Sequence, residues 1–194
     1  HVPGLKVVAP ASVQDAHDLL LMSITDPDPV VVVEHKLLYK TDGPLTVRER
    51  PQDSPARLAE AKIVRDGSDL TVVTYSIGVQ RALEAAERAA EDGIDAQVVD
   101  LRSLRPLDVD TVVDAVSSTG KLLVTHEAPT ILGVGAEIAA TVAGSSALDP
   151  HHAPIRRVGG RDNPMPYAPA LEAATIPQVA DIETAIRELA AEDI

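Results

Sequence analysis

Short runs of valine, leucine and isoleucine recur along this chain, and segments in which apolar residues return at helical spacing separate them. Strands that are buried on both faces of a parallel sheet read as continuous aliphatic runs of this kind. The expected strands are 5–9, 30–33, 61–64, 70–75, 94–101, 121–125 and 155–158, and the expected helices are 13–24, 76–91, 109–118, 135–143 and 181–191. This alternation predicts an α/β fold with a doubly wound, mostly parallel sheet.

Polar and small residues mark the ends of several expected helices. Ser12 and Asp108 precede helical segments and are typical N-caps, whereas Gly93 and Gly120 follow such segments and are typical stops. The polar turn at 66–69 favours a hairpin between the two expected strands that flank it.

Aromatic residues are scarce: the chain has no Phe and no Trp, although 45% of it is hydrophobic. The core must therefore be built from Val, Leu, Ile and Ala. The absence of cysteine excludes disulfides and thiolate chemistry. A net charge of −13 argues against nucleic acid as a partner, because a phosphate backbone requires a basic face. No apolar run reaches the ~20 residues of a membrane span and no signal peptide is visible, so we expect no membrane association and a cytoplasmic location.

Residues 41–58 differ from the rest of the chain because they are polar and rich in proline, as linkers are. We expect one unit at residues 1–45, a linker at 46–58 and a second α/β domain at 59–194. The first strand begins almost at residue 1, without a preceding helix or cap. The chain therefore reads as the back part of a longer protein.

The end of the first expected helix brings together oxygen atoms of two kinds. Its last carbonyls, near Ser23 and Ile24, lack intrahelical partners and carry the negative end of the helix dipole. Asp26 and Asp28 follow at once. Such oxygens suit a hard cation, but each aspartate precedes a proline, so an ordinary helix stop is the simpler interpretation.

Three other motifs could carry chemistry. The glycines in 133–135 open a helix and could admit an anion or allow close backbone packing. His126 and Glu127 end a strand, where open α/β sheets place ligands, but neighbouring side chains on an extended segment diverge. A polar cluster that supports an interface is therefore favoured over direct catalysis. His151 and His152 diverge in the same way, which favours a solvated loop over a metal site.

Several of these segments together carry a resemblance to a known family. They are HVPGLKVV (1–8), VEHK (33–36), DLRSLRPLD (100–108), THEAP (125–129), GVGAEI (133–138) and PMPYA (164–168). In order and spacing they resemble the beta subunit of the thiamine-diphosphate-dependent 2-oxoacid dehydrogenases, a group that includes pyruvate and branched-chain 2-oxoacid dehydrogenases. The resemblance covers nearly the whole chain, and only 41–58 looks idiosyncratic.

The resemblance implies a fold and an assembly. Residues 1–45 would be the C-terminal part of a transketolase-like pyrimidine-binding domain, and residues 59–194 a transketolase C-terminal domain with an open, mostly parallel sheet. The assembled enzyme would be a heterotetramer with an alpha subunit and a second beta subunit. It would oxidatively decarboxylate a 2-oxoacid and acylate lipoyl-lysine. The acidic surface would help to dock the basic peripheral subunit-binding domain of the acyltransferase core.

The resemblance also bears on the site residues. It implies a potassium ion held by the carbonyls of Ser23 and Ile24 together with Asp26 and Asp28, the last replacing an Asn of some relatives. The family's catalytic glutamate and histidine lie upstream of the segment that matches His1, and its diphosphate motif lies on the alpha subunit. We therefore expect no catalytic residue in this chain, with His1 a near-site candidate in a structural role. We also expect that the chain alone does not bind thiamine diphosphate.

Two alternatives stay open. The chain could be a stand-alone docking or assembly module, although an exposed sheet edge at 5–8 argues against that because such edges invite pairing. It could also be the equivalent part of another enzyme of the transketolase superfamily, of the acetoin dehydrogenase or deoxyxylulose-phosphate type. The residues present favour the 2-oxoacid group.

Overall fold

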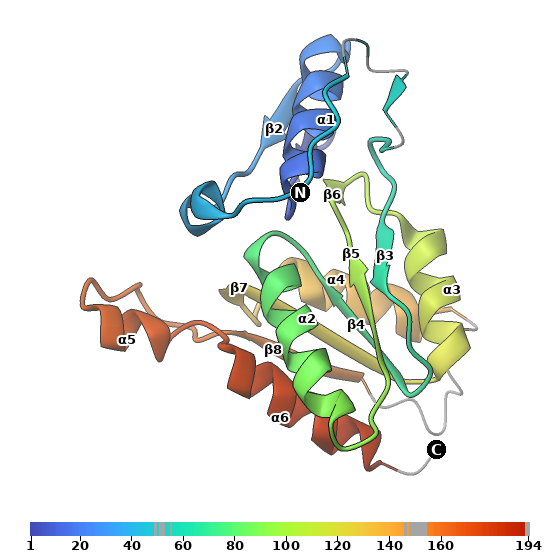
Figure 1. Ribbon diagram of the computed structural model, residues 1–194, viewed down its shortest axis with the longest axis vertical. Helices are drawn as coiled ribbons and strands as arrows, with labels where there is room; N and C mark the ends of the chain where they lie inside the picture. Colours follow the sequence, from blue (N-terminus) through green and yellow to red (C-terminus); the bar gives the residue numbers. More distant parts are fainter. Residues whose placement is uncertain (49, 51–52, 55, 146, 148–154, 193–194) are drawn as a thin grey trace.

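The computed structural model describes residues 1–48, 50, 53–54, 56–145, 147 and 155–192. A small sheet with one long helix lies above a larger sheet that has helices on both faces (Figure 1). The strands are β1 (Lys6–Val8), β2 (Val30–Val32), β3 (Lys62–Arg65), β4 (Leu70–Thr74), β5 (Ala96–Asp100), β6 (Ser103–Arg105), β7 (Leu122–Pro129) and β8 (Ile155–Gly160). The helices are α1 (Val13–Thr25), the 3-10 helix η1 (Lys36–Lys40), α2 (Ile77–Ala90), α3 (Val109–Thr119), α4 (Val134–Ala143), α5 (Pro169–Ala173) and α6 (Val179–Ala190).

The small sheet has the order β2-β1-β6, with β1 parallel to β2 and antiparallel to β6. We call β1, α1 and β2 the first unit. Its small core consists of Val8, Leu19, Met22 and Ala56. Because β6 pairs with β1, the expectation of an exposed sheet edge at residues 5–8 is wrong: β1 is central, and β2 and β6 are the edge strands. The chain returns at β6 from the larger domain, a pairing that nothing local in the sequence predicts.

The larger sheet has the order β3-β5-β4-β7-β8, and we call it with its helices the main domain. Its strands are parallel except for β3, which runs antiparallel to β5. This confirms the expected α/β class with a mostly parallel sheet. The expected hairpin around 66–69 is wrong, because β3 pairs with β5 and not with the adjacent β4.

Alternating side chains of the central strands fill two cores. Val72 and Val98 pack towards α2 and α6, whereas their neighbours Val73 and Val99 pack towards α3 and α4. This follows from the two-residue period of a strand, and it explains why the strands are continuously aliphatic. The buried face of α2 is mainly alanine, which lets α6 pack closely against it.

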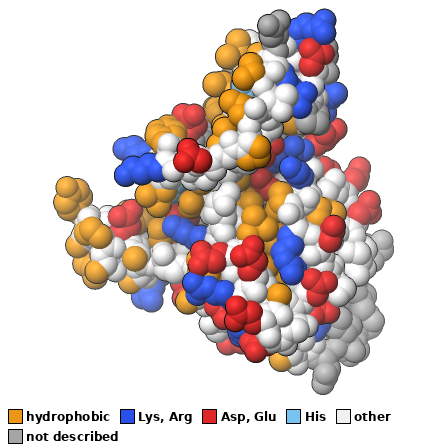
Figure 2. Space-filling view, in the orientation of Figure 1, with side chains coloured by type: hydrophobic (Ala, Val, Ile, Leu, Met, Phe, Trp, Pro, Cys, Tyr) orange, Lys and Arg blue, Asp and Glu red, His pale blue; other side chains and the backbone are white. Residues whose placement is uncertain are grey.

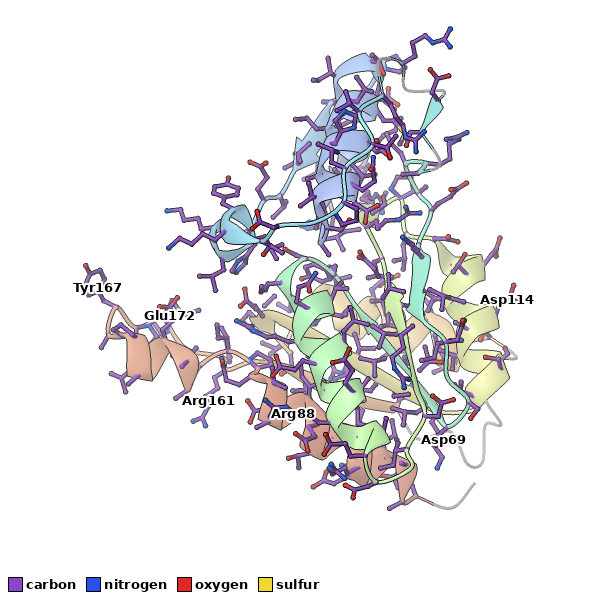
Figure 3. The ribbon with its side chains drawn as sticks, viewed as in Figure 1. Asp69, Arg88, Asp114, Arg161, Tyr167 and Glu172 are labelled. Carbon is purple, nitrogen blue, oxygen red and sulfur yellow. The ribbon has the colours of Figure 1, made fainter. Side chains whose placement is uncertain are left out.

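The expected helix ends are confirmed. The side chains of Ser12 and Asp108 accept hydrogen bonds from the backbone N–H groups three residues on, and Gly93 and Gly120 have φ of 81° and 73°. The helices η1 and α5 were not expected from the sequence. The latter lies on an arm that reaches away from the main domain, with Tyr167 projecting at its tip (Figure 3). Within the described ranges, no helix has the length and apolar character needed to cross a membrane.

Candidate functional site

The first unit meets the main domain at the motifs 33–36 and 125–129. One carboxylate oxygen of Glu127 lies 3.0 Å from Nε2 of His35, and the other accepts a hydrogen bond from Nη1 of Arg81 at 2.7 Å. Arg81, on α2, also donates to the carbonyl of Pro177 at 3.0 Å. Glu127 therefore links the segment after β2 to α2, and through Arg81 to the loop before α6.

His126 turns the other way, as alternation along a strand requires. It is buried, its Nδ1 lies 2.9 Å from the carbonyl of Ala128, and its Nε2 accepts from the backbone N–H of Gly135 at 3.1 Å. These partners assign the proton to Nδ1 and require a neutral ring, and burial lowers the pKa of His126. Both ring nitrogens are engaged, so His126 holds the start of α4 and has no free nitrogen for a substrate.

The glycines at 133 and 135 serve this packing. A Cβ at Gly135 would lie 2.5 Å from Nε2 of His126, and one at Gly133 would lie 2.9 Å from its Cε1. The imidazole therefore occupies the space in front of the α4 N-terminus. Of the two interpretations of this motif, close packing is the one that the geometry supports.

A second polar cluster lies where the chain leaves β5. Arg102 is buried, with its Nη1 3.3 Å from Oδ1 of Asp15 on α1, and its backbone N–H bonds to Asp100 at 2.9 Å. Its carbonyl accepts from the N–H of Ala9 at 2.8 Å. The junction between the two sheets is thus held by a charge cluster on one side and by Glu127 on the other.

The two aspartates in the loop after α1 already pair with a lysine, Lys6 of β1. Nζ of Lys6 lies 2.7 and 2.8 Å from the two carboxylate oxygens of Asp26 and 3.1 Å from Oδ2 of Asp28. The hydrogen bond from Lys6 lowers the pKa of Asp26. Ile24 is largely exposed, and the Ser23 hydroxyl donates to the carbonyl of Leu19 at 2.6 Å. In the part of the chain that is described, no group of three or more His, Asp or Glu side chains is arranged to hold a metal. A potassium ion here stays a prediction.

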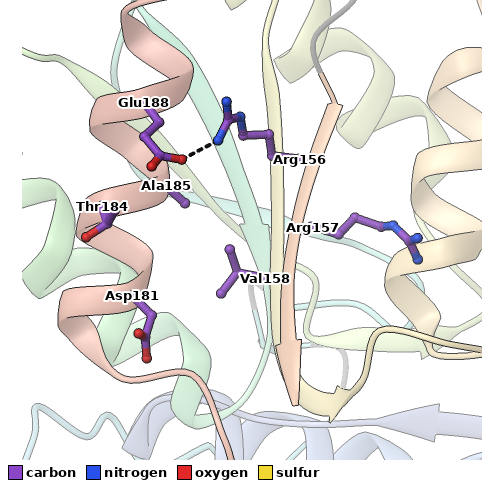
Figure 4. Close-up of a pocket in the computed structure, with 7 residues that line it drawn as sticks. All are labelled: Arg156, Arg157, Val158, Asp181, Thr184, Ala185 and Glu188. Atoms are coloured by element: carbon purple, nitrogen blue, oxygen red, sulfur yellow. Dashed lines mark hydrogen bonds and ion pairs between the residues drawn. The ribbon is translucent and has the colours of Figure 1, made fainter. Parts of the chain in front are cut away.

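Two of the grooves on the surface of the described residues are lined partly by charged side chains. The larger, of about 440 Å³, lies between β8 and α6, and Arg156 pairs with Glu188 across it (Figure 4). Its other lining residues are Arg157, Val158, Asp181, Thr184 and Ala185. The smaller, of about 270 Å³, lies at the carboxyl ends of β1 and β2 and is lined by residues that include Glu34 and Tyr39. His1 is exposed and lines neither groove, and His151 and His152 lie outside the described residues.

The sequence does not predict which residues pair with the side chains of these motifs. His35 and Arg102 belong to the motifs 33–36 and 100–108. Nothing in the sequence near either residue indicates that it pairs with a carboxylate far away in the chain. Arg81 lies on a helix with other charged residues and nothing sets it apart. Only the fold brings these residues to one junction.

Comparison with known proteins places the chain in a family. The family described as "Transketolase, C-terminal domain" matches residues 59–182. The pyruvate dehydrogenase E1 component subunit beta of Rickettsia conorii is 42% identical over 191 residues, which are 97% of this chain and 56% of that protein. The mitochondrial subunit beta-1 of Arabidopsis thaliana is 46% identical over 183 residues, which are 93% of this chain and 50% of that protein.

Two further similarities widen the comparison. The acetoin:2,6-dichlorophenolindophenol oxidoreductase subunit beta of Cupriavidus necator is 44% identical over 189 residues, 97% of this chain and 54% of that protein. A solved structure described as a split gene transketolase, inactive beta4 tetramer, matches the fold with a TM-score of 0.78 at 22% identity, over 100% of this chain and 59% of that one. The chain thus spans about half the length of the curated relatives that it matches. Its sequence is similar to beta subunits of pyruvate dehydrogenase E1 components and of an acetoin oxidoreductase, and the chain belongs to the transketolase C-terminal domain family.

Proposed function

We propose that this chain is the C-terminal portion of the beta subunit of a 2-oxoacid dehydrogenase component. The assembled enzyme oxidatively decarboxylates a 2-oxoacid, pyruvate or a branched-chain one, and acylates lipoyl-lysine. The observation that carries the proposal is the extent of the similarity, which at 42% identity spans 97% of the chain and so includes both units and their junction.

Within that enzyme, the chain serves assembly with an alpha subunit and a second beta subunit. Large apolar side chains are exposed at several places, among them the first unit and the arm that carries α5 (Figure 2). Those on the first unit include Leu20, Ile24, Val31 and Val33, and those on the arm are Met165, Tyr167 and Leu171. Apolar surface of this kind is typical of subunit contacts.

Thiamine diphosphate would supply the decarboxylation chemistry in the assembled enzyme. The residues of this chain do not furnish a diphosphate cradle: the N-terminus of α4 is closed by His126, and no Gly-Asp-Gly…Asn motif is present. The role of this chain is to fix the orientation of its two sheets, so that the surfaces for the other subunits are correctly placed. For potassium we propose the oxygens of Ser23, Ile24, Asp26 and Asp28, with Lys6 as the competitor for the two carboxylates.

The acidic charge of the chain supports a docking role towards the basic peripheral subunit-binding domain of an acyltransferase core. We assign this contact to the wall of α6 that carries Asp181 and Glu188 beside the larger groove, where the basic domain would compete with Arg156 for Glu188. Glu188→Gln should weaken binding of such a domain several-fold, more at low salt than at high salt. Asp114→Asn is the matched control, because it changes the charge equally at an exposed position on α3. Equal effects of both variants would contradict the assignment.

A chimera tests the main proposal. The segment of the Rickettsia conorii beta subunit that this chain does not match is fused upstream of residue 1, and the product is co-expressed with that organism's alpha subunit. We expect thiamine-diphosphate-dependent, 2-oxoacid-dependent reduction of 2,6-dichlorophenolindophenol. The unaltered Rickettsia pair is the positive control. A chimera that assembles with the alpha subunit but turns over no 2-oxoacid would count against the proposal.

An acetoin-cleaving enzyme is the second candidate, because the Cupriavidus subunit is as similar as the pyruvate dehydrogenase subunits are. The same assay separates the two. A chimera built on the Cupriavidus upstream segment, with its own alpha subunit, would turn over acetoin and leave pyruvate and branched-chain 2-oxoacids untouched.

A further inference from the structure

A buried charge cluster joins the first unit to the main domain. Asp100 ends β5, and its Oδ1 accepts a hydrogen bond from the backbone N–H of Arg102 at 2.9 Å. The guanidinium of Arg102 lies 3.3 Å from Oδ1 of Asp15 on α1. Asp15, Asp100 and Arg102 are 6%, 1% and 7% exposed. Three charged side chains therefore lie almost out of water, where unbalanced charge is costly.

The turn at Arg102 also carries the chain into the small sheet. Arg102 has a φ of 53°, which costs an L-residue free energy and persists where the surroundings over-determine it. Its carbonyl accepts from the N–H of Ala9 at 2.8 Å, and β6 begins at the next residue and pairs with β1. The side-chain cluster and the β1–β6 ladder therefore form together or open together.

The charges in the cluster do not balance. The guanidinium of Arg102 pairs with Asp15, whereas Asp100 accepts from the backbone N–H of Arg102. Lys62 is the register partner of Asp100 on β3, at an exposed position. Burial first, and the charge of Asp15 in addition, raise the pKa of Asp100 to about 7 against the opposing effects of Arg102 and Lys62. Asp15 comes from the first unit and Asp100 from the main domain, so their repulsion acts across the junction.

We infer that this cluster makes the attachment of the first unit to the main domain proton-dependent: protonated Asp100 closes the junction, and ionised Asp100 loosens it. The ionised form puts two buried carboxylates on opposite sides of the contact, and the guanidinium of Arg102 pairs with only that of Asp15. The β1–β6 ladder then opens more often, without unfolding of the main sheet. This inference does not depend on the proposed enzymatic function.

Hydrogen–deuterium exchange on the full chain tests the inference directly. The amide of Ala9 reports on the junction, and that of Val73, in the buried strand β4, is the internal reference. After correction for intrinsic exchange, the protection of Ala9 should fall about tenfold between pH 6 and pH 8, because the closed state loses the proton that stabilises it. The protection of Val73 should stay well above that of Ala9 at both pH values, because the junction opens while the main sheet remains folded.

Variants identify the group responsible. Asp100→Asn keeps an oxygen for the Arg102 N–H but cannot ionise, so Ala9 should lose its pH dependence. Asp15→Asn removes the opposing carboxylate and leaves the burial of Asp100, so it should reduce the fall without abolishing it, which keeps the inference testable if the first variant fails to fold. Asp114→Asn, at an exposed position on α3, should retain the tenfold change. A flat wild-type response, or an unchanged tenfold fall in the Asp100 variant, would overturn the inference.

Discussion

His35 and Glu127 lie 92 positions apart in the chain, yet Nε2 of one is 3.0 Å from a carboxylate oxygen of the other. Each belongs to a motif near the carboxyl end of a strand: His35 follows β2, and Glu127 lies in the last part of β7. Arg81 completes the contact from α2. The two motifs that stand out in the sequence therefore meet each other, and the contact orients the first unit on the main domain.

Removal of the Glu127 charge should weaken this junction. In Glu127→Gln, Arg81 and His35 lose their shared carboxylate at a partly buried site, and we expect a loss of about 1–3 kcal/mol in the free energy of unfolding. Urea denaturation measures it. Glu84→Gln is the control, because Glu84 pairs with Arg88 on the exposed face of α2 and its loss should cost at most about 0.5 kcal/mol. Equal losses in the two variants would show that Glu127 is an ordinary surface residue.

The neutral state of His126 predicts a pH dependence. Its pKa is lowered in the folded protein by burial, so below the unfolded value of 6.5 the unfolded chain binds more protons. The stability that His126 contributes is therefore complete above pH 6.5 and is lost as the pH falls, with a slope of at most ~1.4 kcal/mol per pH unit. His126→Gln should be less stable than wild type at pH 7.5, and the difference should shrink towards pH 5. Parallel stability curves for the two proteins would contradict this.

The close approach of α4 to His126 predicts that Gly135 does not tolerate a side chain. In Gly135→Ala the new Cβ would lie 2.5 Å from Nε2 of His126 and 3.1 Å from Cγ1 of Val124, so the ring must move. We expect a loss of about 1–3 kcal/mol, measured by thermal or urea unfolding. Gly144→Ala is the control: its φ is −85° and the nearest atom is 3.3 Å away, so its stability should change by less than about 0.5 kcal/mol.

The loop after α1 predicts a competition between Lys6 and potassium. If potassium binds the oxygens of Ser23, Ile24, Asp26 and Asp28, added potassium chloride should raise the melting temperature beyond the effect of sodium chloride. Asp26→Ala should abolish that difference. Lys6→Gln is the informative counterpart, because it also breaks the Lys6–Asp26 ion pair but leaves the carboxylates, and it should enlarge the response to potassium. Identical curves in both salts for all three proteins would remove the site.

Local signals in the sequence were sufficient for most of the elements but not for their pairing. Ser12, Asp108, Gly93 and Gly120 end helices for reasons that lie within a few residues, and the structure confirms each. The expected hairpin of β3 with β4 failed because β5 competes for the same edge, and a β-turn signal carries no information about that competitor. For the same reason β6 was missed: its partner β1 lies almost 100 residues earlier in the chain.

The candidate site shows the same division. Sequence pattern alone determined that the motif 125–129 ends a buried strand and that His126 and Glu127 point apart, because both follow from the two-residue period of extended backbone. Only the tertiary structure decided that Glu127 meets His35 and Arg81. It also decided that Lys6 pairs with Asp26 and Asp28, and that the buried Arg102 pairs with Asp15. Periodicity, caps and stops are short-range steric and hydrogen-bonding effects that neighbouring residues determine. Ion pairs and pKa shifts depend on which distant segments pack together and exclude water. They are therefore determined only when the two sheets pack against each other.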